Sequence, residues 1–451
     1  MGRLKFSRGL FALAVLAMPL SYGVKNLLAL DAVWVNPTLL LGLIIFVLMK
    51  APVEDKTALW LVLFTFVSAF CGSFLMSPVV DSGKSPAYVT YVEPIRLTLN
   101  VIWFWVCIRF LKLDRQLVIR WLVACVLLEF GIAAYLYMGL YDLVPTPDIV
   151  HLYLEMYKTR QAILWGDITI YRMAGTFDES PLFGVFEFSC FVPLFLEVIR
   201  RRKNCESAFW PTLAALLAFT GAVASISDQV LVALFIFCMA VLWFGVGGSR
   251  SASPTAVTKE EWAHGLLTKS ILVILTFALF LYVGSHQVER WQEQSSNSSS
   301  ASTAGQSTGE RLFHTKYALG LFLEQPISVV VGIGSGRYGN YVGRTGIYQS
   351  TVTPQVTPVE WLVEGGIVGM LLVSLWLFQI GQNAARVYGR LGTAAVISVL
   401  VANSLQGVWK WESWFLCLAF LFSSGCSRDW KLSPAPNLQE PRSVLLDPNG
   451  A

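Results

Sequence analysis

Apolar segments long enough to cross a lipid bilayer recur along most of this chain, and they leave it few possible folds. The hydrocarbon core of a membrane is about 30 Å thick, so a spanning helix needs about 20 mostly apolar residues. Backbone groups in lipid must be hydrogen-bonded internally, which favours helices. Only 14% of the residues are charged, against about 25% in soluble domains. The sequence therefore predicts an all-α polytopic membrane protein with about 12 transmembrane helices, at residues 9–25, 33–50, 57–76, 95–111, 117–138, 180–199, 207–224, 228–246, 268–284, 357–380, 392–408 and 411–425.

Lysine and arginine collect in loops that alternate along the chain, and this pattern predicts an orientation. Cytoplasmic loops of membrane proteins carry an excess of these residues. The basic loops contain Arg3, Lys5, Arg8, Lys50, Lys56, Lys112, Arg115, Arg120, Arg200, Arg201, Arg202, Lys203, Arg250, Lys259, Lys269, Arg386, Arg390, Arg428 and Lys431. We therefore expect both termini in the cytoplasm and an uncleaved first span. The expected layout is nine spans in 1–284 with an exterior loop near 139–179, a large exterior loop at 285–356, three spans in 357–425 and a cytoplasmic tail at 426–451.

Composition excludes several classes of function. No basic stretch carries interleaved aromatic residues on a soluble face, which argues against a nucleic-acid partner. No P-loop is present, which disfavours an ATP-driven transporter. Six of the eight cysteines lie in predicted spans, and none lies in the long exterior loops at about 77–94, 139–179 and 285–356. We therefore expect no structural disulfide. The four histidines are not at ligand spacing, and we expect neither a metal ion nor a cofactor.

Ionisable residues concentrate in the exterior loops, where they are candidates for function. Arg172 precedes a predicted span, and Arg311 begins an amphipathic helix in which His314 shares its face. The planar guanidinium group suits bidentate binding of phosphate. Several arginines at one membrane surface therefore suggest a lipid-linked phosphate or pyrophosphate as ligand. The alternative is that they bind lipid headgroups or the carboxylates of their own loops.

Two glutamates lie one helical turn apart where the tenth predicted span begins. Thr357-Pro358 is a plausible helix start, because proline is favoured at the first helical position. Glu360 would then be stabilised by the helix N-terminus even without a functional role. Glu364 lies deeper and must either pair internally or contact substrate. Gly365 and Gly369 form a GxxxG pattern, which we interpret as close helix packing.

Four short elements follow one another on the exterior side of the predicted spans. They are Arg172-Met-Ala-Gly-Thr-Phe-Asp-Glu-Ser-Pro-Leu-Phe-Gly184, Ser225-Ile-Ser227, the helix from Arg311 to Glu324-Gln-Pro326 with Gly332-Ile-Gly334-Ser-Gly336 after it, and Glu364-Gly-Gly366-Ile-Val-Gly369. Each element is short and unspecific by itself. Their order, spacing and common placement, over most of the chain, resemble the O-antigen polymerases and O-antigen ligases of bacterial envelopes.

The resemblance implies a GT-C-like, metal-independent glycosyltransferase in the bacterial inner membrane, with its active site facing the periplasm. Its donor would be a glycan on undecaprenyl pyrophosphate, and its acceptor a second lipid-linked repeat unit or lipid A-core. A chain-length regulator protein is a possible partner. The implied residues are a catalytic base, with Glu179 preferred over His314 and Glu360, and pyrophosphate ligands at Arg172, Arg311, Arg337 and Arg160.

The same resemblance leaves two reactions open and favours one. Ligases typically carry a His-Asn pair about nine residues before the Glu-x-Gly element, whereas this chain has Gln355-Val356 there. The Asp178-Glu-Ser-Pro181 element is also closer to the type seen in polymerases. We therefore prefer a polymerase of surface polysaccharide, such as O-antigen or exopolysaccharide. A ligase is the alternative, with His314 in the role of the missing histidine. A transporter or flippase for lipid-linked sugars is a second alternative, although no convincing internal repeat supports it.

Overall fold

The computed structural model describes most of the predicted membrane region. The described residues are 2–27, 36–75, 86–148, 150, 154, 162–165, 168–177, 179–244, 303–324, 326–334, 337–338, 356–404 and 412–424. The predicted span at 268–284, Arg160 and the tail at 426–451 lie outside them. The predicted exterior loop at 285–356 is described only at residues 303–324, 326–334, 337–338 and 356.

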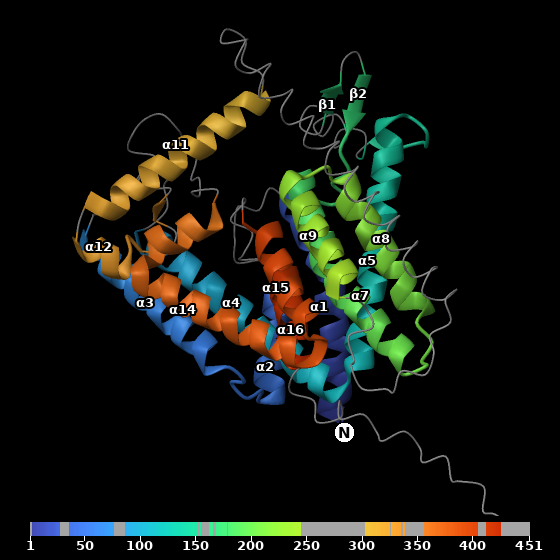
Figure 1. Cartoon of the computed structure of the whole chain (residues 1–451), viewed down its shortest axis with the longest axis horizontal. Helices are drawn as coiled ribbons and strands as arrows, with labels where there is room; N and C mark the ends of the chain where they lie inside the picture. The colour runs from blue at the N-terminus through green and yellow to red at the C-terminus, as the bar shows by residue number, and fades with distance from the viewer. Residues whose placement is uncertain are drawn as a thin grey trace, which may run out of the picture.

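Apolar helices account for most of the described chain, as the sequence predicts. They are α1 (Gly2–Leu27), α2 (Pro37–Met49), α3 (Lys56–Leu75), α4 (Pro86–Leu113), α5 (Arg115–Leu140), α7 (Ser180–Lys203), α8 (Phe209–Ala224), α9 (Asp228–Phe244), α11 (Thr303–Glu324), α12 (Pro326–Val331), α14 (Thr357–Tyr388), α15 (Arg390–Ala402) and α16 (Glu412–Ser424). Each predicted span that falls on described residues overlaps one of these helices, although the bounds differ by several residues for α4, α14 and α15. Figure 1 shows them side by side, with α11 lying across one end of the bundle.

Five of these helices are long and apolar enough to cross a membrane by length and composition: α3, α4, α5, α7 and α14. The shorter apolar helices α2, α8, α9, α15 and α16 have 10–17 residues each. This supports a polytopic membrane protein. The helix starts follow capping rules: Asn36 and Asp114 each accept a hydrogen bond from the backbone two or three residues into their helix. Pro358 lies in the first turn of α14, as expected.

Helix α7 is the centre of the bundle. It packs against α8, α16, α5 and α9. Of its most apolar 18 residues, 89% are buried inside the protein. The side chains of Phe183, Phe186 and Phe188 are fully buried in its first half. Burial on all sides explains why this helix is apolar all round rather than amphipathic. Its first turn lies at the end of the bundle where the candidate residues gather.

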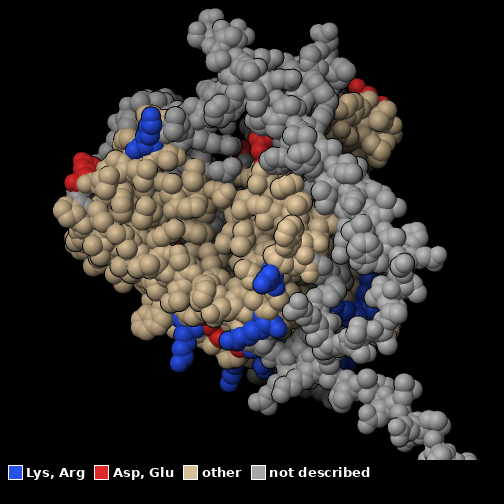
Figure 2. Space-filling model, viewed as in Figure 1, with Lys and Arg blue, Asp and Glu red and all other residues tan. Residues whose placement is uncertain are grey.

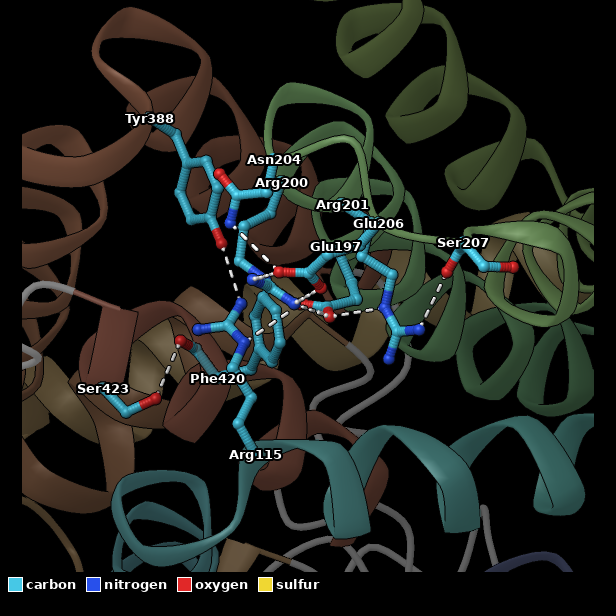
Figure 3. Close-up of polar contacts among 10 residues, drawn as sticks. All are labelled: Arg115, Glu197, Arg200, Arg201, Asn204, Glu206, Ser207, Tyr388, Phe420 and Ser423. Carbon is cyan, nitrogen blue, oxygen red and sulfur yellow. Dashed lines mark hydrogen bonds and ion pairs between the residues drawn. The ribbon is translucent and has the colours of Figure 1, made fainter. Parts of the chain in front are cut away.

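Basic side chains gather at the other end of the bundle, which we call the basic end (Figure 2). It carries Lys50, Lys56, Lys112, Arg120, Arg202, Lys203, Arg386 and Arg390, all exposed. A buried carboxylate also lies there: Glu197 of α7 accepts hydrogen bonds of 2.8–3.0 Å from Arg115, Arg200 and Arg201. Figure 3 shows the guanidinium groups converging on it. This network joins α5 to α7 by charge.

A small β-hairpin departs from the expected all-α fold. Strands β1 (Ala162–Trp165) and β2 (Ile168–Tyr171) pair antiparallel, with Trp165 opposite Ile168. They fall in the predicted exterior loop near 139–179, and Figure 1 shows them projecting at the end opposite the basic one. Strand β1 is wholly apolar and β2 alternates over only a few residues, so both are too short for their pattern to predict strands. The hairpin leads directly to Arg172.

Candidate functional site

The segment after the hairpin forms a tight buried turn at residues 174–177. The Phe177 N–H donates to the Ala174 carbonyl at 3.0 Å, and the Phe177 ring is fully buried against Phe183 and Phe186. Gly175 has φ of +56°, a conformation that glycine adopts at little cost. The hydrogen bond and the buried ring therefore hold the turn in place, and Arg172 stands just before it.

A carboxyl group inside the bundle holds this turn. Glu129 of α5 is fully buried, and its Oε1 accepts the Thr176 N–H at 2.9 Å. Its Oε2 lies 3.0 Å from Thr176 Oγ1, which is also 2.9 Å from the carbonyl oxygen of Pro19 in α1. A Cβ on Gly175 would collide with Glu129 Oε1. Glycine is thus required at 175 by both its φ and its neighbour.

The serine-rich turn between α8 and α9 lies beside this segment. The Met173 N–H donates to the Ala224 carbonyl at 3.0 Å, which joins the two chains next to Ser225. Ser225 packs against Gly184 in the second turn of α7, where a Cβ would collide with its Oγ. Ile226 has φ of +46°, which is rare and strained for a β-branched residue. Backbone strain of this kind clusters at functional sites.

The structure thus brings Arg172, Glu179 and the serine turn together. Glu179 is the residue before α7; its side chain is exposed and makes no capping hydrogen bond. Arg172 is half-buried, and Asp228 is exposed at the first position of α9. A carboxylate and a guanidinium group therefore share one end of α7, α8 and α9 with the buried serine turn, where the Ser225 hydroxyl donates to the Ala222 carbonyl. These groups can hold an anion and accept a proton.

A second group of candidates surrounds a break in α14. Gly366 has φ of +66° and ψ of −170° inside this helix, a conformation essentially confined to glycine. The break releases two carbonyl groups from the helical ladder. The Val363 carbonyl accepts from the Ile333 N–H at 2.9 Å, and the Glu364 carbonyl accepts from the Gly334 N–H at 3.2 Å. The segment 332–334 therefore replaces the missing turn of the helix.

Glycines make this contact between the break in α14 and the segment 332–334 possible, and we call the contact the interlock. A Cβ on Gly332 would collide with the Glu364 carbonyl, and a Cβ on Gly366 would collide with the Val330 carbonyl. Helix α3 joins this contact through Ser68. The Ser68 Oγ lies 2.7 Å from the Val331 carbonyl oxygen and 2.8 Å from the Glu364 carbonyl oxygen. This interlock gives a physical reason for two of the glycine-rich elements in the sequence.

Arg337 and His314 lie next to the interlock and are almost fully buried. Arg337 donates to the Gly72 carbonyl in the last turn of α3, where a cation is favoured by the helix end. The Tyr338 hydroxyl donates to the His314 carbonyl at 2.9 Å and lies 2.9 Å from His314 Nδ1. Since that hydroxyl has one hydrogen, Nδ1 must donate to it. Nε2 of the neutral ring is then the acceptor.

Glu360 is fully buried in the first turn of α14. This turn is held from α15, because the Thr357 N–H donates to the Ser404 carbonyl at 2.8 Å and its hydroxyl to the Asn403 carbonyl at 2.6 Å. Glu360 and Glu364 line a cavity of about 30 Å³ between α3, α4 and α14. That is room for one water molecule. Gly369 packs on Phe64 of α3, which confirms the predicted close helix packing.

The remaining two candidates are only partly described. Arg311 lies within α11, which ends at Glu324 as predicted but begins earlier, at Thr303; its side chain is outside the description. Arg160 lies outside the described residues altogether. The roles predicted for Arg172, Arg311, Arg337, Arg160, Glu179, His314 and Glu360 therefore stay predictions.

Two residues that hold the site were missed in the sequence. Glu129 lies in an apolar span, 47 residues before its partner Thr176, and nothing near it in the chain marks it except the cost of placing a carboxyl group in a membrane helix. Ser68 is an ordinary small residue of a span. An intramembrane acid could have been singled out on cost alone; the serine could not.

Comparison with known proteins gives one match. Residues 213–374, somewhat more than a third of the chain, match the family model described as O-Antigen ligase. The matched stretch contains the serine turn, α11, the segment 332–334 and the break at Gly366, but not the turn that carries Arg172. No curated protein and no solved structure matches the chain. Over these residues, the match confirms the resemblance of the sequence to the O-antigen polymerase and ligase superfamily.

Proposed function

We propose that the protein transfers a glycan from a polyprenyl pyrophosphate to a sugar hydroxyl, and that it is a polymerase of lipid-linked repeat units. A glycosyltransferase-like role of the O-antigen ligase and polymerase type is supported by the family match. The observation that carries the finer proposal is the shared placement of Arg172 and Glu179 beside the serine turn, at the end away from the basic side chains.

The proposed reaction assigns one task to each kind of group. The acceptor hydroxyl oxygen forms a bond to the anomeric carbon, while the bond from that carbon to the pyrophosphate oxygen breaks. Glu179 takes the hydroxyl proton as general base. The electron pair leaves with the pyrophosphate, whose developing charge is stabilised by arginine guanidinium groups. Arg172 is the first of these, and Arg311, Arg337 and Arg160 are the further candidates.

The membrane arrangement follows from the same proposal. We place the basic end in the cytoplasm, because exposed lysine and arginine mark that side. The candidate residues then face the periplasm of a bacterial inner membrane. About 12 spans with both termini cytoplasmic, and a GT-C-like architecture, complete this proposal. Undecaprenyl pyrophosphate fits as the lipid carrier, since its charged end would lie at the level of Arg172.

A ligase is the second candidate, and one observation favours it. His314 is held by Tyr338 with Nε2 as the acceptor nitrogen, as a general base requires. The polymerase remains preferred because Glu179 is exposed whereas His314 is almost fully buried, and because Gln355-Val356 stands where ligases carry His-Asn.

Purified variants test the assignment of the arginines. We expect Arg172→Ala and Arg311→Ala each to lower the rate of chain extension on a lipid-linked repeat unit by about 100-fold, the usual loss for one group that stabilises developing negative charge. Arg386→Ala is the matched control, because this arginine of α14 lies at the basic end and contacts only Asn383 among its described hydrogen bonds. Wild-type rates in both test variants, with normal folding, would refute the assignment.

Glycan profiling of a deletion strain separates the two reactions. For a polymerase, long chains disappear while lipid A-core still carries one repeat unit. For a ligase, every repeat unit disappears from lipid A-core. Unchanged profiles would contradict both.

A further inference from the structure

Glu129 makes an unusual set of contacts for an acid inside an apolar bundle. It lies in the middle of α5 with no exposed surface, and both of its oxygens face the backbone turn at 174–177. The contact partners come from one residue, Thr176, whose N–H and hydroxyl meet the two carboxyl oxygens separately. The carboxyl group of Glu129 therefore binds both the backbone and the side chain of Thr176, and we call this pair of contacts the clamp.

Counting hydrogens shows which form of the acid fits. Thr176 Oγ1 lies near two oxygens, Glu129 Oε2 at 3.0 Å and the Pro19 carbonyl at 2.9 Å. A hydroxyl has one hydrogen to donate. If Glu129 is ionised, one of these two contacts joins oxygens with no hydrogen between them. If Oε2 carries a proton, the Glu129 O–H donates to Thr176 Oγ1, whose own hydrogen goes to Pro19. Every group is then satisfied.

The surroundings of Glu129 agree with the neutral form. Among the described residues, no lysine or arginine lies within ion-pair distance of Glu129 or of Glu187, the neighbouring buried acid on α7. The other titratable groups that interact with this pair are the thiols of Cys125 on α5 and Cys190 on α7. None of these groups supplies a positive charge, and an unpaired buried charge is costly.

We propose that Glu129, in its protonated form, is the positioning residue of the turn that carries Arg172 and Glu179. It fixes the backbone through Thr176 and does not itself meet substrate. The turn begins two residues after Arg172 and ends two residues before Glu179, so its shape sets the separation of the two groups. This consequence for catalysis rests on the proposed function, whereas the clamp and its proton do not.

Three variants test the clamp. Glu129→Gln keeps an oxygen for the Thr176 N–H and puts an N–H where the acid proton would be, so it mimics the protonated form. Glu129→Ala removes both contacts. Thr176→Val removes the hydroxyl and keeps the size of the side chain. The matched controls are Glu187→Gln, a buried acid on the next helix, and Thr220→Val, whose hydroxyl bonds only the Leu216 carbonyl of its own helix.

Amide hydrogen exchange of the peptide that contains 173–179 reads the clamp directly. We expect Glu129→Ala to speed exchange of the Thr176 amide by about tenfold or more, Thr176→Val to speed it less, and Glu129→Gln and both controls to leave it unchanged. Fast exchange in Glu129→Gln would show that the ionised acid is needed. Unchanged exchange in Glu129→Ala would show that there is no clamp. Either result overturns the proposal, and Glu129→Gln and Thr176→Val decide it even if Glu129→Ala does not fold.

Kinetics on a lipid-linked repeat unit test the consequence for catalysis. A displaced catalytic pair lowers kcat, by about 10-fold to 100-fold for small displacements, and we expect this in Glu129→Ala with little change in KM. Glu129→Gln should have a kcat within about twofold of the wild-type value. Altered exchange together with an unchanged kcat would reject the positioning role. If Arg172→Ala is also fully active, the failure lies in the proposed function instead, and the clamp stands.

Discussion

The two ends of the bundle hold themselves together in different ways. At the basic end, side chains bind side chains: Glu197 is shared by three arginines, and Arg115 also bonds the Tyr388 hydroxyl of α14 and lies 4.4 Å over the Phe420 ring of α16. At the opposite end, several side chains bind backbone instead. Glu129 accepts the Thr176 N–H, and the Ser68 hydroxyl lies within hydrogen-bond distance of the Val331 and Glu364 carbonyl oxygens. The first arrangement fixes how helices pack, and the second fixes the shapes of loops.

This difference shows where chemistry can be placed. Ion pairs between helices tie up the charges that form them, so little is left at Glu197 for a ligand. Loops fixed through their backbone can present their remaining side chains to a substrate. The basic end should therefore respond to mutation mainly in stability, and the opposite end in both stability and turnover. Three substitutions test that division.

The largest effect should come from Gly366→Ala. Alanine does not adopt φ of +66° with ψ of −170°, and its Cβ would collide with the backbone at Val330 and Gly332. We expect a loss of more than about 4 kcal/mol in unfolding free energy and loss of chain extension. The measurements are the apparent unfolding temperature in detergent and the extension rate.

Gly381→Ala is the control for this prediction. It lies in the same helix, and a Cβ there meets nothing within 4 Å. It should be neutral or stabilising by up to about 1 kcal/mol. Equal behaviour of the two variants would mean that the break in α14 is unimportant, and the contrast between the two ends would fail.

A smaller effect, confined to stability, is expected for Glu197→Ala. Removing the shared carboxylate leaves three partly buried guanidinium groups, each with 16–19% of its side chain exposed, without their common acceptor. The cost should be about 3 kcal/mol. Turnover per folded molecule should stay at the wild-type level, because this network lies away from the candidate site. A fall in turnover with an unchanged unfolding temperature would contradict the division between the ends.

The smallest effect is expected for Glu206→Gln at the basic end. Hydrogen bonds from Arg200 hold the pKa of Glu206 below its usual value. A lowered pKa stabilises the fold above the usual glutamate value of about 4.3, and this contribution is lost as pH falls through the lowered pKa. Because Glu206 is 38% exposed, the gain at neutral pH is under about 1 kcal/mol. The unfolding temperatures of wild type and variant should therefore differ by a constant amount above about pH 4.3 and converge as the pH falls below that value. A gap that stays unchanged below that value would show that the ionised form of Glu206 contributes nothing.

Local patterns predicted the helices but not the contacts between them. The apolar runs, Pro358 at the start of α14 and Pro326 after α11 all marked elements correctly, because their causes lie within a few residues of chain. Arg115, Glu197 and Tyr388 come from three distant parts of the sequence. The loop arginines and lysines predicted a basic side, but nothing in them indicated a shared acid.

The break in α14 shows a different limit. The apolar character of the helix continues through Gly366, so a sequence pattern sees one uninterrupted span. Only the segment at 332–334, which supplies the missing hydrogen bonds, shows why the helix can stop and resume. The family resemblance identified both glycine-rich elements in the sequence, but only the structure shows that they contact each other. Glu129 could be singled out by the cost of its burial, but its partner Thr176, 47 residues away, could not.

The interlock at α14 also has a consequence for how a substrate enters. If the segment 332–334 moved away, the Val363 carbonyl would lose the Ile333 N–H and the Glu364 carbonyl would keep only Ser68 as a donor. Buried carbonyl groups that lose partners are costly, so opening here is opposed. This part of the molecule therefore resists opening, and under the proposed function a lipid-linked chain would reach the site along a route that leaves these contacts in place.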